Sequence, residues 1–388
     1  MNINYFINRF QKKLIQQDQL SLIRKRKSVS SKTKNCYTIN KNTANSFCSN
    51  DYLGLSQNSD LIKVFKKTVN QFGIGSTASQ YIIGYTDLHQ EFETSFSKFM
   101  NCDRALLFGS GYLANLGVIS ALTEKNDMIL MDKYNHASLI DAAKLSNASF
   151  KRYIHNDLEG LRNMLEVINS PKVIVSDGVF SMTGEIANIP ELSTIANHSE
   201  SLLIIDDTHG VGIFGKKGAG TCSNFSLTQN EVHLITTSLG KAFGSYGAMV
   251  CGSQIIIEYL EQFARTGIYS TAIPSVLVAA GIKALEILEN ETWRREKLHY
   301  LISFFDAVAK ELDLNILNSI SPIKIIPIGD NQKVIAISES LLEAGFLVAA
   351  IRPPTVPLKQ ACLRITLTCL HTEKQIKNLL LWIKKLLS

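Results

Sequence analysis

Short apolar runs alternate with segments of helical spacing between about residues 46 and 285. The apolar runs are LLF (106–108), MILMD (128–132), KVIVSDG (172–178), SLLIIDD (201–207), HLITTS (233–238) and AMVCG (248–252). Apolar residues recur at helical spacing between them, over 60–72, 87–101, 111–122 and 187–199. Strands that are apolar throughout are buried on both faces, as in a mostly parallel sheet covered by helices. The pattern predicts a large α/β domain whose site lies at the carboxyl ends of its strands.

The two ends of the chain follow other patterns. Near the start, Ile3, Phe6, Ile7, Phe10 and Leu14 recur at helical spacing among basic residues, and a polar stretch and a short strand-like stretch follow. This predicts an amphipathic arm that packs on the body of the protein, although mitochondrial transit peptides have a similar pattern. After about residue 286, two long helical patterns flank short strands and a proline-rich loop. We therefore predict an N-terminal arm (1–45), a large domain (46–285) and a smaller α+β C-terminal domain (286–388).

Composition narrows the class of protein. The chain has 388 residues, of which 45% are hydrophobic, so it can bury a large core and is too long for one simple domain. The net charge is +6, and the basic residues are scattered apart from Lys12-Lys13 and the run from Arg24 to Lys27. This balance favours an enzyme that handles anionic substrates, and a nucleic-acid-binding protein is the alternative.

The cysteines and the longest apolar runs exclude two further classes. There are seven cysteines and no pair has CxxC spacing, which argues against a disulfide framework or a metal site and for a reducing compartment such as the cytoplasm. No apolar run reaches the roughly 18 residues that a membrane span needs. We therefore expect neither a metal nor a membrane partner.

Two of the predicted strands lead directly into residues that could bind a cofactor with an aldehyde group. SLLIID ends at Asp206, and HLITTS runs directly into Leu239-Gly240-Lys241. In a parallel sheet both strand ends lie at the same edge, so a carboxylate and an amine converge there. This pair suits pyridoxal phosphate (PLP), because a lysine amine can bind the aldehyde and a carboxylate can keep the pyridine nitrogen protonated. Lys241 lies in the apolar, glycine-rich stretch SLGKAFGSYG, where a solvated lysine is unusual.

Other residues near strand ends could complete such a site. Gly111 and Tyr112 open a helix after an apolar strand, and a helix N-terminus offers free N–H groups to a phosphate. His136 follows MILMD and could stack on a pyridine ring, although a buried structural histidine fits equally well. His209 follows Asp206 by three residues and could reach the same edge.

Nine stretches together resemble one family, the α-oxoamine synthases, which are fold-type I PLP-dependent transferases. They are SNDYLGLS (49–56), GIGSTASQYIIGY (73–85), GSGYLAN (109–115), NHASL (135–139), DGVFSMTGEIA (177–187), DDTHGVG (206–212), TSLGKAFG (237–244), IYSTAIP (268–274) and RPPTVP (352–357). The resemblance covers essentially the whole chain. It implies that Lys241 holds PLP covalently, with Asp206 on the pyridine nitrogen, His209 on the ring oxygen and His136 stacked on the ring.

The resemblance also implies further contacts. The cofactor contacts it adds are Gly111, Tyr112, Ser181 and Ser238, with Ser270 and Thr271 reaching the phosphate of the partner subunit in an obligatory homodimer. The implied substrate contacts are Arg364 for the amino-acid carboxylate, Asn50 beside it, and Arg24, Arg352 and Thr355 on the acyl-thioester side. Three positions depart from the usual motifs: Thr208 stands for alanine, Ser238 for threonine and Gln80 for arginine.

Within the family, the stretches AIRPPTVP (350–357), LRITLTCLH (363–371) and FARTGIYST (263–271) are most similar to the member that acts in biotin biosynthesis. This implies a decarboxylative condensation of L-alanine with a pimeloyl thioester, carried by CoA or by a carrier protein. A member that uses glycine or serine and an inactive relative with a regulatory role are the alternatives.

Overall fold

The computed structural model describes residues 3–39 and 41–388. The chain divides into two compact units, one formed by residues up to 49 together with 299–388, and the other by residues 50–298. The predicted division at residues 45 and 285 stays a prediction. These units group the N-terminal residues with the C-terminal ones, and each unit is described below by itself.

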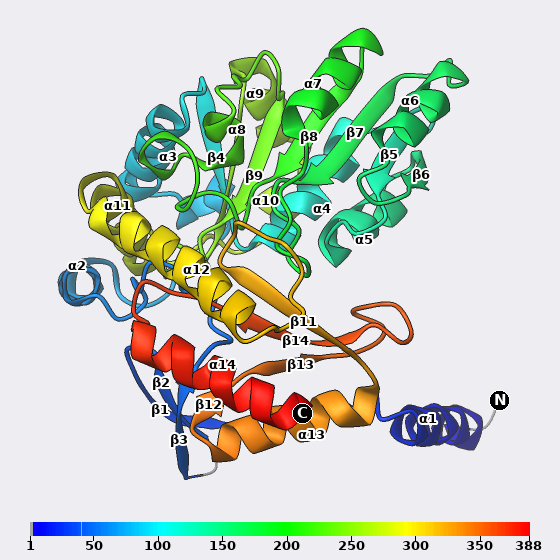
Figure 1. Ribbon diagram of the computed structural model, residues 1–388. Helices are drawn as coiled ribbons and strands as arrows, with labels where there is room; N and C mark the ends of the chain where they lie inside the picture. Colours follow the sequence, from blue (N-terminus) through cyan, green and yellow to red (C-terminus); the bar gives the residue numbers. More distant parts are fainter. Residues whose placement is uncertain (1–2, 40) are drawn as a thin grey trace. The chain divides into compact units, whose positions relative to one another are not determined.

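The unit of residues 50–298 is built around a seven-stranded sheet (Figure 1). In sheet order the strands are β4 (Arg104–Phe108), β10 (Ala248–Gly252), β9 (Leu234–Ser238), β8 (Leu202–Asp206), β7 (Lys172–Asp177), β5 (Met128–Asp132) and β6 (Ser149–Tyr153). The run from β9 to β6 is parallel, whereas β10 is antiparallel to both of its neighbours. Six of these strands coincide with the predicted apolar runs, and β6, a polar edge strand, had no apolar signal.

Along the central strands, the residues that point to one face of the sheet and those that point to the other are both buried, as the predicted pattern requires. Ile204 of β8 belongs to one apolar cluster with side chains of α4, α5 and α9, whereas Leu203 and Ile205 belong to another with side chains of α6 and α7. Successive side chains of a strand point to opposite faces, so the side chains on each face of the sheet pack on a separate layer of helices. The sheet is therefore covered on both faces, and its open ends are the places left for chemistry.

Helices fill the connections of this unit, as the periodicity predicts. They are α2 (Ser59–Phe72), η1 (Gln80–Gly84), α3 (Asp87–Met100), α4 (Gly111–Leu122), α5 (Ala137–Leu145), α6 (Leu158–Glu166), α7 (Ile189–His198), η2 (Lys216–Gly218), α8 (Gly220–Asn224), α9 (Gln254–Phe263), α10 (Arg265–Ile268) and α11 (Ser275–Asn290). The helix α12 (Trp293–Glu311) continues from this unit into the other.

The other unit has two smaller sheets among its described residues. One has the order β11 (Ile323–Gly329), β14 (Ala361–Thr366), β13 (Ala349–Ile351), and the other the order β1 (Val29–Thr33), β2 (Cys36–Ile39), β3 (Asn42–Ser46), β12 (Phe346–Leu347). Its further helices are α1 (Ile3–Gln19), α13 (Asn331–Glu343) and α14 (Glu373–Leu387). Phe47 joins the early residues to the late ones, because its N–H donates to Leu347, its carbonyl accepts from Thr366, and its ring stacks on His371 at 4.1 Å.

The predicted amphipathic helix at the start of the chain forms as α1. None of its residues 3–19 is buried, so the described chain itself does not cover its apolar side. Among the described residues, no helix has the length and apolarity that crossing a membrane would require.

The edge strand β4 is closed by side chains rather than by another strand. Leu107 N–H donates to Glu93 Oε1 at 2.8 Å, and Leu107 carbonyl accepts from Gln80 Nε2 at 2.9 Å. Tyr85 donates to the other Glu93 oxygen at 2.6 Å. These contacts satisfy backbone groups that an edge strand would otherwise leave open. Gln80, one of the departures from the family motifs, therefore has a structural partner.

Burial raises the pKa of Glu93 to about 7, against the opposing effect of the hydrogen bonds from Tyr85 and Leu107. A carboxyl with a raised pKa in the folded state stabilises the fold at low pH, and this contribution is lost as the pH rises from about 4.5 through 7.

We predict that Glu93→Gln removes this pH dependence, because the amide keeps a carbonyl for Leu107 and cannot ionise. Between pH 5.5 and 8.5 the free energy of unfolding of the parent protein should fall by roughly 2 kcal/mol more than that of the variant, measured by denaturant titration. Glu91→Gln, an exposed position on the same helix, is the control. An equal pH slope in the parent and Glu93→Gln proteins would contradict the prediction.

Candidate active site

The carboxyl ends of the parallel strands bring polar side chains to one edge of the sheet. Asp206 is the last residue of β8 and is only 5% exposed. Its Oδ2 accepts a hydrogen bond from Asn115 Nδ2 at 2.7 Å, and its Oδ1 accepts from Thr208 N–H at 3.0 Å. Asn115 is itself fixed, because its carbonyl oxygen accepts from Thr236 of β9 and its amide also donates to Ser138. The carboxylate thus has a defined orientation.

Thr208 joins the loops that follow β8 and β9. Its hydroxyl accepts from Ser238 N–H at 3.1 Å, a bond that alanine at this position would not make. Ser238 in turn lies against the start of α4, where a Cβ on Gly111 would be 3.3 Å from the Ser238 Cβ. Glycine at position 111 therefore lets the N-terminus of α4 approach the end of β9. The departure from the family motif at Thr208 adds the hydrogen bond from Ser238 and removes none.

His209 is buried beside Tyr52 and Asn50. The Tyr52 hydroxyl lies 2.7 Å from His209 Nδ1 and 3.3 Å from Asn50 Oδ1. The Tyr52 hydroxyl fixes the ring of His209 and links it to the side chain of Asn50. Through Tyr52, the structure therefore brings together His209 and Asn50, which were predicted from different motifs.

His136 is the N-cap residue of α5 and is exposed. Its backbone N–H donates to Asp177 Oδ2 at 2.8 Å, and its Nδ1 lies 2.8 Å from the hydroxyl of Ser138. Asp177 ends β7, and burial together with the neighbouring Asp206 raises its pKa. His136 is therefore held by hydrogen bonds while the residue stays exposed.

A second histidine, His155, holds the turn that carries His136. Its Nδ1 lies 2.9 Å from Asp132 Oδ1 at the end of β5, and its Nε2 lies 3.0 Å from Glu185 Oε2. The ring stacks on Tyr134 at 4.2 Å. Both ring nitrogens donate only when the imidazole is protonated. Burial lowers the pKa of His155, but the bonds to the two carboxylates outweigh it and the net shift is upward.

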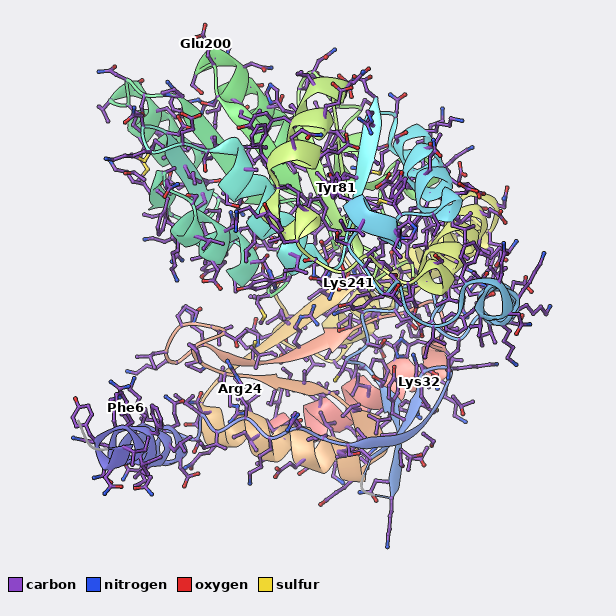
Figure 2. All side chains as sticks on the ribbon, turned by 180° about the vertical axis from the view of Figure 1, so that it is seen from behind. Phe6, Arg24, Lys32, Tyr81, Glu200 and Lys241 are labelled. Atoms are coloured by element: carbon purple, nitrogen blue, oxygen red, sulfur yellow. The ribbon has the colours of Figure 1, made fainter. Side chains whose placement is uncertain are left out.

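Lys241 follows β9 by three residues and is half-buried; it is labelled in Figure 2. Three residues further on, Gly244 has a φ of +60°, and a Cβ there would be 2.3 Å from Ser56 N. A side chain at this position would therefore push the 241–244 turn away from the SNDYLGLS segment. The predicted convergence of Asp206 and Lys241 rests on β8 and β9, which are parallel neighbours.

The remaining predicted cofactor contacts of this unit lie in three places. The Tyr112 hydroxyl donates to Asp141 on α5. Thr271, next to Ser270, forms an isolated bridge with Ser79. Ser181 lies in the loop between β7 and α7, which is closed by a bridge between Val179 and Ile186. Their roles toward a cofactor or a partner subunit stay predictions.

The predicted substrate contacts other than Asn50 lie in the other compact unit. Arg364 is in the central strand β14, is 9% exposed and donates to Thr366 at 3.1 Å. Arg24 donates to the Thr355 hydroxyl at 3.3 Å, and Arg352 donates to the carbonyl of Ser21. The structure thus brings the three acyl-side candidates together.

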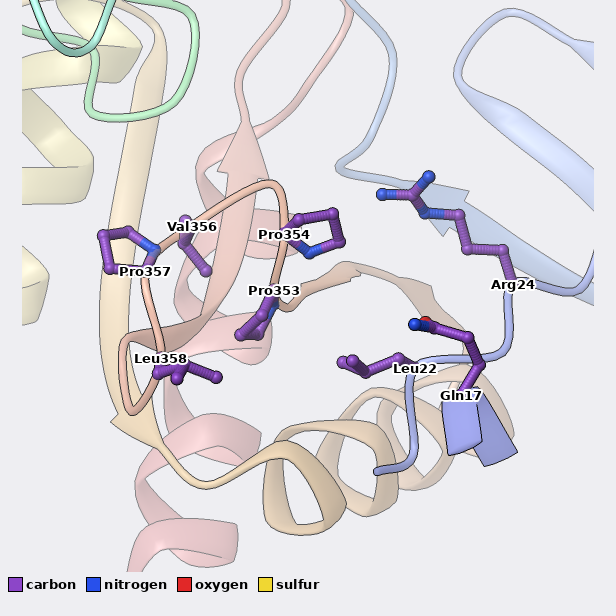
Figure 3. A pocket seen from close by; sticks show the side chains of 8 residues that line it. All are labelled: Gln17, Leu22, Arg24, Pro353, Pro354, Val356, Pro357 and Leu358. Carbon is purple, nitrogen blue, oxygen red and sulfur yellow. The ribbon is translucent and has the colours of Figure 1, made fainter. Parts of the chain in front are cut away.

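Arg24 lines a cavity of about 510 Å³ (Figure 3). Its walls are mostly apolar, with Arg24 at one side. The lining residues are Gln17, Leu22, Arg24, Pro353, Pro354, Val356, Pro357 and Leu358.

Comparison with known proteins identifies the family. The family model of the class I and II aminotransferases matches residues 44–383. The chain belongs to this family. The 8-amino-7-oxononanoate synthase of Pseudomonas entomophila is 45% identical over 334 residues, 86% of each chain. That of Cellvibrio japonicus is 42% identical over 358 residues, 92% of this chain and 90% of the relative.

Solved structures agree with this assignment. The 8-amino-7-oxononanoate synthase of Francisella tularensis is 36% identical, with a TM-score of 0.78 over 88% of this chain and 96% of that one. Serine palmitoyltransferase of Sphingomonas wittichii is 25% identical, with a TM-score of 0.92 over 97% of each chain. The predicted resemblance to the α-oxoamine synthases and the fold-type I architecture are therefore confirmed.

This aminotransferase-family chain is an enzyme that uses PLP, and a serine palmitoyltransferase structure of TM-score 0.93 contains that cofactor. The residues present fit PLP. A buried carboxylate held by Asn115 suits a protonated pyridine nitrogen, and α4 begins at Gly111 beside Ser238, where the N–H groups of a helix N-terminus can bind a phosphate.

Sequence reasoning missed the residues that hold these groups. Asn115 lies inside the quoted GSGYLAN motif but was not assigned a role, and Tyr52 lies inside SNDYLGLS. His155 lies outside all of the motifs, and its position between Asp132 and Glu185 emerges only from the fold.

We predict that Asn115→Ala weakens PLP binding by about tenfold or more, because it removes a hydrogen bond to a buried carboxylate, worth about 1.5–3 kcal/mol. Absorbance titration of cofactor-free protein with PLP measures this affinity. Asn197→Ala, at an exposed position of α7, should bind PLP as the parent does. Unchanged affinity in Asn115→Ala would show that Asp206 does not depend on this amide.

We predict that His155→Gln lowers the free energy of unfolding by roughly 2 kcal/mol at pH 6, where the imidazolium is bonded to both carboxylates. Because the folded pKa is raised above the usual 6.5, this stabilisation is complete below pH 6.5 and is lost as the pH rises through the folded pKa. Denaturant titrations at pH 6 and pH 9 test the sign, with His198→Gln on α7 as the control. A penalty that grew toward pH 9 would contradict the protonated state.

Proposed function

We propose that the enzyme condenses L-alanine with a pimeloyl thioester to give 8-amino-7-oxononanoate, carbon dioxide and a free thiol, in biotin biosynthesis. The observation that carries the proposal is the pairing of β8 with β9, which brings Asp206 and the Lys241 turn to one edge of the sheet. The shared name of the relatives that are 42–45% identical supports this activity over that of other α-oxoamine synthases.

PLP supplies an electron sink that stabilises a negative charge on the α-carbon of the amino acid. Asp206 would hold the proton on the pyridine nitrogen, and His209, fixed by Tyr52, would donate toward the ring oxygen. The His136 ring would stack on the cofactor. Gly111, Tyr112, Ser181 and Ser238 would line the cofactor, and Arg364 would bind the carboxylate of alanine, with Asn50 beside it.

Lys241 is the proposed base. Its neutral amine takes the α-proton of alanine. The α-carbon then bonds to the thioester carbonyl carbon, the carbon–sulfur bond breaks, and the thiolate leaves and takes a proton from water. The alanine carboxylate is lost as carbon dioxide, and the Lys241 ammonium returns a proton to the same carbon.

The acyl side of the reaction is proposed for the cavity beside Arg24. A mostly apolar wall suits the methylene chain of a pimeloyl group, and a guanidinium suits a carboxylate. Arg24, Arg352 and Thr355 are the proposed contacts there, and the bond from Arg24 to Thr355 supports a common role.

We also propose a cytoplasmic homodimer. Ile74, Ile82 and Ile83 are 80%, 74% and 71% exposed, which supports an interface over this segment. Ser270 and Thr271 would reach the partner's phosphate. All seven cysteines are free, which supports a reducing compartment.

The test follows the absorption of PLP-loaded protein on addition of L-alanine, glycine or L-serine, and then the release of thiol from pimeloyl-CoA. We expect the spectrum to respond to alanine and thiol release to need both substrates. Lys241→Ala should lose at least about a thousandfold in kcat, as expected for removal of a base that is also the covalent anchor.

Lys216→Ala, at an exposed lysine of the same unit, should keep the parent rate. A preference for glycine or serine would assign the chain to another activity of the family. Turnover of Lys241→Ala at the parent rate would refute the proposed chemistry.

A further inference from the structure

The net excess of positive charge in the protein comes from its first 50 residues. These contain ten lysines and arginines and one acid, Asp18, so they carry a net charge of +9. The other 338 residues contain 30 basic and 33 acidic residues, a net charge of −3. The overall value of +6 therefore describes one local basic segment on a slightly acidic enzyme, rather than a basic enzyme.

The densest part of this segment is the basic strap, which we define as Arg24, Lys25, Arg26 and Lys27. Figure 2 shows the chain running from the helix of Phe6 past Arg24 to the strand of Lys32. All four side chains of the strap are exposed. Within the described part of the chain, Lys25, Arg26 and Lys27 are in no ion pair, so their charges are available to a partner.

The strap is held at both ends. Before it, Asn331 donates to the carbonyl of Leu20 at 3.3 Å and Arg352 donates to that of Ser21. After it, β1 pairs with β2 from Val29 onward. The four cations therefore occupy a defined surface rather than a loose tail, which reduces the entropy lost when a partner binds.

The strap also adjoins the proposed acyl cavity. Leu22 and Arg24 line that cavity, and the exposed Lys25 to Lys27 follow Arg24 directly in the chain. We propose that the basic strap is a docking surface for an acidic carrier protein that presents the acyl thioester on its flexible prosthetic arm. This inference rests on the proposed function, and it names the donor of the acyl group.

The extent of the strap favours a protein over a small anion. Four consecutive residues span about 10 Å at the roughly 3.3 Å rise of extended chain, so several separate carboxylates can be met at once. Nucleic acid is less favoured because the rest of the protein is net negative, and phosphate recognition needs a broad basic face. A membrane is less favoured because the strap itself has no large apolar residue to insert.

The test compares two double variants with equal loss of charge. Lys25→Glu/Lys27→Glu alters the strap without touching Arg24, and Lys66→Glu/Lys67→Glu alters two exposed lysines of α2. For each protein, kcat/KM is measured with the pimeloyl group on a purified bacterial acyl carrier protein and on CoA, at 50 and 300 mM salt.

We expect the strap variant to lose about tenfold in kcat/KM with the carrier protein at low salt, mainly through KM, because exposed charges act on association. With pimeloyl-CoA it should lose less than about twofold. The loss should shrink at high salt, where screening weakens the parent as well. The α2 variant should match the parent with both donors.

Three results would overturn the proposal. An equal loss with both donors would make the strap a site for a small anion. No loss with either would make it a solvated surface. A strap-dependent affinity for duplex DNA or anionic phosphatidylserine vesicles, with none for the carrier protein, would assign it to another class of partner.

A binding measurement separates this inference from the proposed reaction. Unacylated carrier protein with its phosphopantetheine arm is titrated into the PLP-loaded enzyme by calorimetry. Binding to the parent and the α2 variant, and about tenfold weaker binding to the strap variant, supports docking even if no condensation is found. Equal binding by all three proteins overturns docking even if condensation is confirmed.

Discussion

The structure depends on one buried carboxylate. Removing an ionised group from water is costly unless its hydrogen bonds are replaced, so Asp206 can lie at the end of β8 only if neighbouring elements supply donors. Asn115 does so from α4, 91 residues away in sequence, and is itself fixed by Thr236 of the adjacent strand. This arrangement defines how β8, β9 and α4 lie around the cofactor site.

Other carboxylates at this edge of the sheet also accept hydrogen bonds from neighbouring elements. Asp177 accepts from the backbone of His136, and Asp132 accepts from the backbone of Tyr134 and Asn156 and contacts His155. Each carboxylate ends a different parallel strand and satisfies the N–H groups of a nearby turn. The site is therefore built by anchoring loops to strand ends, which places His136 and the 241–244 turn on rigid elements.

The sequence predicts most of the strands of this sheet but few of the side-chain contacts that hold the site residues in place. Apolar runs such as MILMD and SLLIID locate buried strands because burial on both faces removes polar alternation, and the edge at which Asp206 and Lys241 meet follows from parallel pairing. The polar edge strand β6 has no such signal. The contacts of Asn115, Tyr52 and His155 could not be inferred either, because they join residues that become neighbours only through tertiary packing. The substrate roles of Arg24, Asn50, Arg352, Thr355 and Arg364 were implied by the family resemblance alone.

Charge is used in two physically different ways in this protein. Around Asp206 the charges are few, buried and individually bonded, and their effect is large because water does not screen them. In the first 50 residues the charges are many, exposed and of one sign, and each is weak alone. Buried charges determine the protonation of single groups, whereas an exposed row acts over a distance on whole partners. The anchoring of the basic strap between Arg352 and β1 keeps that row in place, so that a pocket wall and a charged surface are made by adjacent residues of one segment.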